Sequence, residues 1–167
     1  MRRTLAVAGL LALVAGCGPA EAQPDRRTDD VRETRPGPIA HLADVRVGVH
    51  EDFDRLVLEF TDRVPGYTVG YRALPAHADA SGKVIPLPGA DAMVLVTLNP
   101  ATATGWTDGE QTYFGPSTVR ADTRQVTEVK EAGDFEAVLT WVVGLRQKAP
   151  FAVSVLDDPP RLVVDLG

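Results

Sequence analysis

The sequence predicts an all-β fold, an antiparallel β-sandwich of about eight strands, and three observations support this prediction. Apolar and polar residues alternate with a period of two in eight stretches between residues 39 and 167, which is typical of strands buried on one face. Turn-forming combinations such as Val64-Pro65-Gly66 and Asp157-Asp158-Pro159-Pro160 separate these stretches. No stretch combines the apolar spacing of a helix with capping residues.

The expected strands follow one another as 43–50, 53–60, 66–74, 91–99, 123–131, 135–146, 151–157 and 161–166. Strand 53–60 alternates clearly, which directs Leu56, Leu58 and Phe60 toward a core. Strand 135–146 has the clearest pattern, because one face is apolar throughout: Phe135, Ala137, Leu139, Trp141, Val143 and Leu145. We therefore expect Trp141 to lie in the core of the sandwich.

The N-terminus carries a signal for export. Arg2 and Arg3 form a short basic start, and residues 5–14 form an apolar stretch that is too short to span a membrane. Small residues follow and precede Cys17, the only cysteine of the chain. Residues 1–16 are therefore predicted to be a signal peptide.

Residues 14–17, Val-Ala-Gly-Cys, resemble the bacterial lipobox. The resemblance implies that Cys17 becomes the mature N-terminus and that its thiol carries diacylglycerol, so that membrane lipid is a partner of the protein. Two or three acyl chains hold a protein firmly on a membrane. The expected location is the outer face of the cell membrane. The alternative is an ordinary signal peptide cleaved after Ala20 or Ala22, with Cys17 discarded.

Residues 17–38 separate this signal from the domain at 39–167. They are charged and contain several prolines, and Val31 is their only aliphatic residue larger than alanine. Such a segment buries too little apolar area to offset the entropy of ordering. We expect a flexible tether, the alternative being a segment that binds a partner.

The charge and the cysteine content limit what the domain can bind and how it can be stabilised. The formal charge is −6, which argues against binding the phosphate backbone of nucleic acids. A single cysteine cannot form an intramolecular disulfide, so an exported domain must rely on its hydrophobic core.

No catalytic or metal-binding motif stands out. The sequence lacks a Gly-x-Ser-x-Gly elbow, a His-Glu-x-x-His pair and a phosphate-binding Gly-x-x-x-x-Gly-Lys loop. The three histidines are scattered, at His41, His50 and His77. The carboxylates of residues 50–54 are expected to be solvated in a hairpin turn, because no calcium-ligand spacing is present. We expect no enzyme activity, no cofactor and no metal.

Two groups of residues are candidates for ligand binding. The long connection 99–117 contains Trp106, Tyr113 and Phe114, whose rings could stack on sugars or anchor a partner. The alternative is that these rings fold back and plug the open end of the sandwich. Arg55 and Arg161 alternate with acidic residues on the outward faces of their strands, which predicts either a cross-strand charge ladder or a polar groove for a ligand.

Three segments, FDRLVLEF at 53–60, VPGYTVGY at 64–71 and the stretch from Gly133 to Leu166, resemble the AMIN-like domain of actinobacterial lipoproteins. That family is named for its similarity to the AMIN domain of cell-wall amidases and secretins. The resemblance covers residues 41–167 and implies a β-sandwich that binds peptidoglycan without catalysis. No amidase or secretin module accompanies the domain here, and the family offers no motif sharp enough to transfer residue by residue.

The sequence thus predicts a membrane-anchored envelope lipoprotein whose domain binds peptidoglycan or another cell-wall polymer. The alternative is a lipoprotein that assembles with another envelope protein. A polar groove lined by Trp106 or Tyr113 would favour the first, and an exposed apolar patch would favour the second.

Overall fold

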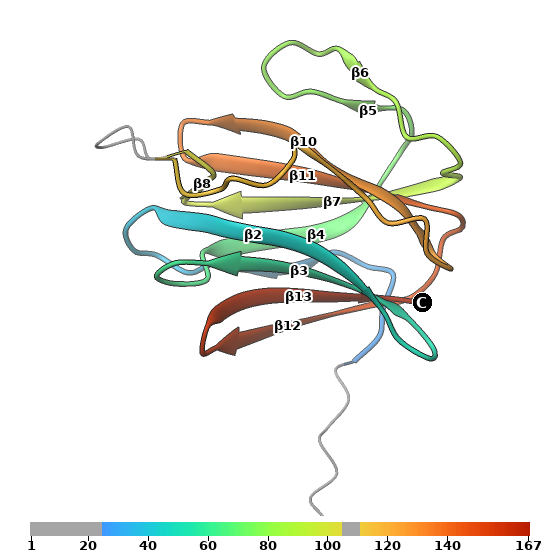
Figure 1. Ribbon diagram of the computed structural model, residues 1–167, viewed down its shortest axis with the longest axis horizontal. Coiled ribbons are helices and arrows are strands. Elements are labelled where there is room, and N and C mark those ends of the chain that lie inside the picture. Colours follow the sequence, from blue (N-terminus) through green and yellow to red (C-terminus); the bar gives the residue numbers. More distant parts are fainter. Residues whose placement is uncertain (1–24, 105–110) are drawn as a thin grey trace, which may run out of the picture.

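A computed structural model describes residues 25–104 and 111–167, and in these residues it contains thirteen strands and no helix (Figure 1). The strands are β1 (Val31–Glu33), β2 (Ala40–Val49), β3 (Asp54–Phe60), β4 (Gly66–Arg72), β5 (Ala76–His77), β6 (Val84–Ile85), β7 (Ala92–Asn99), β8 (Ala101–Thr102), β9 (Thr118–Arg120), β10 (Val126–Phe135), β11 (Val138–Leu145), β12 (Phe151–Asp157) and β13 (Pro160–Leu166). None of the described residues forms a helix that could cross a membrane.

Two sheets form the sandwich. The six-stranded sheet has the order β1-β4-β7-β11-β10-β9, and the five-stranded sheet has the order β12-β13-β3-β2-β8. Every pairing in them is antiparallel except the short parallel contact between β2 and β8. The predicted all-β sandwich is confirmed. The eight expected strands correspond to the eight long ones, and the other five have only two or three residues, too few to produce a visible alternation.

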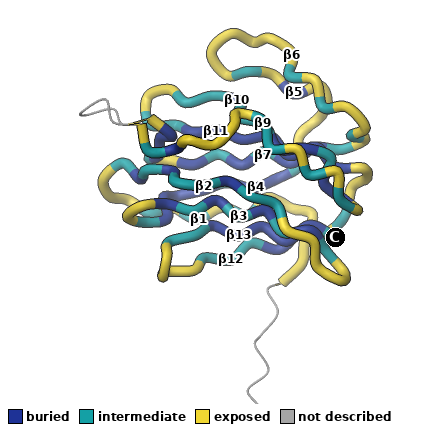
Figure 2. Tube along the Cα trace, in the orientation of Figure 1, coloured by how far each residue is buried: buried dark blue, intermediate teal, exposed yellow. Residues whose placement is uncertain are grey.

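The core lies between the sheets, and Figure 2 shows buried positions recurring along the long strands, as in the alternating pattern of β3. Leu56, Leu58 and Phe60 of β3 are buried there as predicted. Trp141 of β11 is also fully buried, and its ring meets that of Tyr113 edge to face with the centroids 5.7 Å apart. This burial confirms the face assigned to Trp141 and gives the two sheets a shared interior.

The stretch expected as one strand, 135–146, begins instead with a tight turn. β10 ends at Phe135 and β11 begins at Val138, and the two residues between them, Glu136 and Ala137, have φ values of 51° and 60°. Positive φ at both central positions is the geometry of a two-residue hairpin turn. Phe135 is consequently 57% exposed, so the prediction that it faces the core is wrong.

Residues 25–38, which we call the N-terminal strap, pack on the domain and so differ from the expected tether. Arg27 exchanges two backbone hydrogen bonds of 2.8 Å with Phe151 at the edge of β12. A few residues later, β1 pairs with β4 of the other sheet, and Val31 packs against the core. Backbone pairing and one buried valine thus hold a segment whose composition alone predicts disorder. Cys17 and residues 18–24 lie outside the described residues.

Asp54 corrects a second expectation, because it is buried and not solvated. One carboxylate oxygen accepts hydrogen bonds from the backbone N–H groups of Gln125 and Val126, at 2.7 and 2.9 Å, and from the Thr123 hydroxyl. Asp54 therefore ties the start of β3 to the turn between β9 and β10.

The β5–β6 hairpin stands outside the two sheets, at the top of Figure 1. It packs on the outer face of the six-stranded sheet through a small apolar cluster that includes Ala76, Met93 and Val142. The chain that returns from this hairpin to β7 passes over the same outer face.

Candidate functional site

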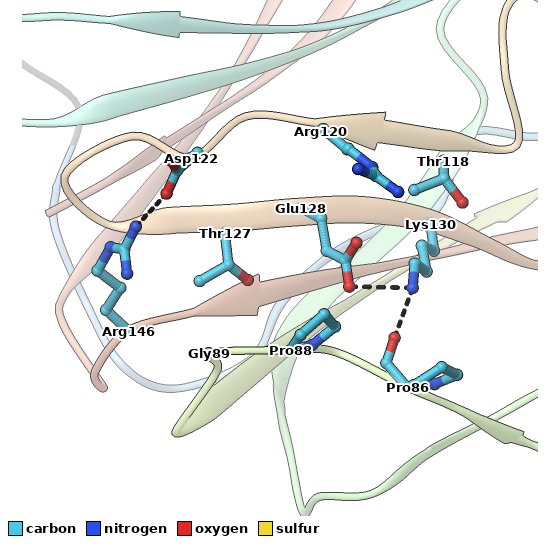
Figure 3. Close-up of a pocket in the computed structure, with 10 residues that line it drawn as sticks. All are labelled: Pro86, Pro88, Gly89, Thr118, Arg120, Asp122, Thr127, Glu128, Lys130 and Arg146. Atoms are coloured by element: carbon cyan, nitrogen blue, oxygen red, sulfur yellow. Dashed lines mark hydrogen bonds and ion pairs between the residues drawn. The ribbon is translucent and has the colours of Figure 1, made fainter.

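A cleft of about 910 Å³ lies where the returning chain, Pro86–Gly89, faces β9 and β10 (Figure 3). Its lining residues are Pro86, Pro88, Gly89, Thr118, Arg120, Asp122, Thr127, Glu128, Lys130 and Arg146. We call it the proline-walled cleft. It combines hydroxyl groups, charged groups and apolar ring faces, which is the mixture that ligand sites commonly present.

Strand pairing brings the polar groups of the cleft together. Arg120 of β9 is the cross-strand partner of Glu128 on β10, and Thr118 is the partner of Lys130. Paired residues project from the same face of a sheet. These four side chains therefore form two adjacent rows over the outer face.

A β-bulge adds Thr127 to this face. The register between β10 and β11 shifts between Val126 and Glu128, so Thr127 projects beside Glu128 instead of opposite to it. Its neighbour across the strands is Gly144, where an added Cβ would lie only 2.6 Å from the Thr127 hydroxyl oxygen. Glycine at position 144 thus makes room for Thr127. The Thr127 hydroxyl is buried and has no hydrogen-bond partner among the described residues.

Two of the three basic side chains in the cleft are engaged by neighbours. Lys130 Nζ lies 3.0 Å from Glu128 Oε1 and donates a 2.6 Å hydrogen bond to the Pro86 carbonyl, which holds the returning chain against β10. Arg146 pairs with Asp122, as Figure 3 shows.

Arg120 differs from both. It is exposed and forms no ion pair or hydrogen bond with any residue that the structure describes. Its guanidinium group offers five N–H donors in a fixed plane. Arg120 is therefore the side chain of the cleft best placed to meet an acidic or hydroxyl-rich ligand.

The sequence-predicted arginines lie on the opposite side of the sandwich, on the outer face of the five-stranded sheet. Arg55 of β3 and Asp165 of β13 are cross-strand partners, joined by hydrogen bonds of 2.6 and 2.9 Å. These hydrogen bonds raise the pKa of Arg55 above its usual value. The charge-ladder alternative is thus realised at this pair.

The second expected pair of the ladder is rearranged. Arg161 and Glu59 are cross-strand partners, but Glu59 binds Arg46 at 2.9 Å. Arg161 donates to the backbone carbonyls of Pro159 and Asp158. Each arginine on this face is therefore satisfied by its own neighbours.

The aromatic residues of the long connection do not act together. Tyr113 is buried against Trp141, and its hydroxyl donates to the Pro116 carbonyl at 2.9 Å. Burial raises the pKa of Tyr113. Tyr113 thus plugs the end of the sandwich, whereas Phe114 is 80% exposed. Trp106 lies outside the described residues.

Sequence reasoning missed the proline-walled cleft. The sequence predicts only a turn at Pro88-Gly89, and Arg120 precedes the stretch expected as a strand. The available signal was the polar face of 123–131, with Thr127, Glu128 and Lys130 close together. Among the described residues, no three His, Cys, Asp or Glu side chains gather in a way that could hold a metal ion.

Comparison with known proteins gives one result. Residues 40–167 match the family profile described as AMIN-like domain. No curated protein and no solved structure matches the chain. The matched residues form more than half of the 167-residue chain, from the start of β2 to its end. The chain therefore belongs to the AMIN-like domain family.

Proposed function

We propose that this protein is an envelope lipoprotein whose AMIN-like domain binds peptidoglycan or another cell-wall polymer without catalysis. In this proposal the protein is exported, and acylated Cys17 holds it on the outer face of the cell membrane. The proposal joins the lipobox-like residues 14–17 to the family match over residues 40–167.

The observation that carries the binding role is the proline-walled cleft. It is open to solvent on the outer face of the six-stranded sheet and offers Arg120, which has no partner among the described residues, beside the hydroxyl of Thr118. Pro86 and Pro88 face these groups across the cleft (Figure 3). Donors on one wall and apolar rings on the other suit a polymer whose units have polar edges and apolar faces.

A sedimentation experiment tests this role. The mature chain, with Cys17→Ser to prevent acylation, is mixed with purified sacculi and the bound fraction is measured. We expect wild type to sediment with sacculi and Arg120→Ala to bind about tenfold more weakly, because a charge-assisted hydrogen bond is lost. Arg161→Ala is the matched control, since it removes an arginine from the opposite face, and it should bind like wild type.

Equal binding by Arg120→Ala and wild type would contradict the assignment of the cleft. Loss of binding in Arg161→Ala would move the site to the five-stranded sheet. If wild type does not sediment at all, the cell-wall role is wrong, and crosslinking in intact cells would test the other candidate function, assembly with an envelope protein.

The anchor has its own test. In the full-length chain, Cys17→Ala should abolish acylation and release the protein from the membrane fraction. Continued sedimentation of the variant with membranes would contradict the anchor.

A further inference from the structure

A second surface on the six-stranded sheet lies beyond the proline-walled cleft. Thr68 of β4 is the cross-strand partner of Thr97 of β7, and Thr97 is in turn the partner of Thr140 of β11. We call these three residues the threonine row. The strands lie side by side in the sheet, with β7 in the middle (Figure 1).

The threonine row faces away from the core. Each threonine sits between two buried core residues of its own strand, as Thr97 does between Val96 and Leu98. Because side chains alternate along a strand, the threonines project from the outer face. None of their hydroxyls forms a hydrogen bond with any residue that the structure describes.

Two threonines outside the row, Thr102 and Thr123, do have partners. The hydroxyl of Thr102 donates to Asp134 at 2.8 Å, and that of Thr123 donates to Asp54. Thr140 is only 3% exposed, yet its hydroxyl has no hydrogen-bond partner within residues 25–104 and 111–167. Thr140 also lines one of the depressions described below, so its hydroxyl is available to a ligand there.

Two shallow depressions meet at the centre of the row. One, of about 220 Å³, contains Thr68, Thr97 and Asn99. The other, of about 410 Å³, contains Thr97, Thr140 and Phe135. Thr97 lines both, so the two depressions adjoin at the middle of the row, and we refer to them together as the groove. The exposed ring of Phe135 lies at one end of it.

The shape and charge of this groove suggest the kind of ligand. Neighbouring strands are about 4.8 Å apart, so the hydroxyls repeat at that interval, close to the length of one pyranose unit in an extended glycan. Four charged residues border the groove: Arg32, Glu33, Asp79 and Glu136. Acidic groups outnumber basic ones among them, which disfavours a polyanion.

We propose that the threonine row binds the uncharged backbone of a glycan strand lying across β4, β7 and β11, with one sugar ring against Phe135. Each threonine hydroxyl can donate to and accept from a sugar hydroxyl or acetamide group. An aromatic ring offers an apolar face to the apolar face of a sugar. This inference rests on the proposed function, in that it names the part of the wall polymer that is recognised.

The test uses oligomers of N-acetylglucosamine as the probe and isothermal titration of the mature chain carrying Cys17→Ser. Thr97→Val removes the central hydroxyl and preserves side-chain shape and branching. We expect about a fivefold loss of affinity in Thr97→Val and a similar loss in Phe135→Ala. Thr61→Val is the matched control, because Thr61 lies in the exposed turn after β3, and it should bind like wild type.

Circular dichroism and the melting temperature of each variant establish that it is folded. Equal affinity of Thr97→Val, Phe135→Ala and wild type would overturn the inference, as would the absence of any binding to the oligomers. Binding of stem peptide in place of the oligomers, lost in Thr97→Val, would overturn it in favour of a peptide site.

This inference and the proposed function can fail separately. If wild type binds sacculi but not the oligomers, the wall role stands and the threonine row is wrong. If wild type binds the oligomers through Thr97 but not sacculi, the row stands and the wall is not its target.

Discussion

The two outer faces of the sandwich differ in what their polar groups bind. On the five-stranded sheet, Arg55 binds Asp165, and Arg46 binds Asp44 and Glu59. On the six-stranded sheet, Arg120 and the threonine row have no partner among the described residues. A face whose charges satisfy each other stabilises the fold and has few donors left for a ligand. A face with unpartnered hydroxyls contributes little to stability, and those hydroxyls can bind a ligand.

The largest expected loss of unfolding free energy comes from a substitution in the core, against which the effects on the two outer faces can be compared. Trp141 and Thr140 are consecutive residues that project to opposite sides of β11. Trp141→Ala should lower the free energy of unfolding by roughly 3 to 5 kcal/mol, because it opens a cavity beneath Tyr113. Urea denaturation measures the loss, and Trp141→Phe should lose less. A change below about 0.5 kcal/mol would contradict the burial of Trp141.

The next effect tests the five-stranded face. Asp165 is nearly buried and Arg55 is about one-third exposed, with relative exposures of 6% and 35%. Asp165→Asn should cost about 2 kcal/mol of unfolding free energy, since it weakens a charge-assisted pair. Asp158→Asn, in the exposed turn before β13, is the control and should change little. Similar values for the two variants would remove the stabilising role assigned to this face.

A smaller effect is expected at the edge of the six-stranded face, where the strap attaches. A hydrogen bond from the Tyr67 hydroxyl and the neighbouring Arg35 hold the pKa of Glu33 below its ordinary value of 4.5. Because the folded-state pKa is the lower one, ionised Glu33 stabilises the fold above pH 4.5, and this contribution disappears as the pH falls through the folded-state pKa.

Glu33→Gln should therefore be slightly less stable than wild type at pH 7, by less than about 1 kcal/mol since the site is half exposed. The difference between the two proteins should shrink as the pH is lowered from 7 to 3. Urea denaturation at pH 7 and at pH 3 measures this. A constant difference between the two pH values would contradict the assigned role of Glu33.

The smallest effect is expected on the threonine row itself. Thr97→Val should change the free energy of unfolding by no more than about 0.5 kcal/mol, because the Thr97 hydroxyl has no hydrogen-bond partner in the part of the chain that the structure describes. The comparison is sharpest here, since the same variant should lose affinity for a glycan. A large loss of stability would show that the row serves the fold.

The long strands could be predicted because alternation over six or more residues reports one buried face. Leu56 and Trp141 were placed correctly for this reason. The turn at Glu136-Ala137 was not predicted, because positive φ at two positions is usually signalled by Asn or Gly, and neither is present. Likewise, a three-residue strand such as β1 depends on a partner, β4, that local sequence does not reveal.

The candidate sites depend on register, which accounts for their absence from the sequence prediction. Thr68, Thr97 and Thr140 are more than twenty residues apart from one another in sequence and meet only through the pairing of β4 with β7 and of β7 with β11. The aromatic residues of the connection 99–117 were predicted as ligand-binding candidates because aromatic residues are rare in this chain. Tyr113 then proved to belong to the core, where its ring covers Trp141.

The strap also sets the reach of the protein. With Cys17 acylated as proposed, eight peptide units join the lipid to Asp25, and fully extended they span at most about 29 Å. A tether that ran to residue 38 would span at most about 75 Å. If Cys17 is acylated as proposed, the fastening of residues 25–38 to both sheets would confine the domain to a thin layer next to the membrane. The domain would then reach only polymer within that layer, so the number of residues between Cys17 and the strap would set the depth of the envelope at which it binds.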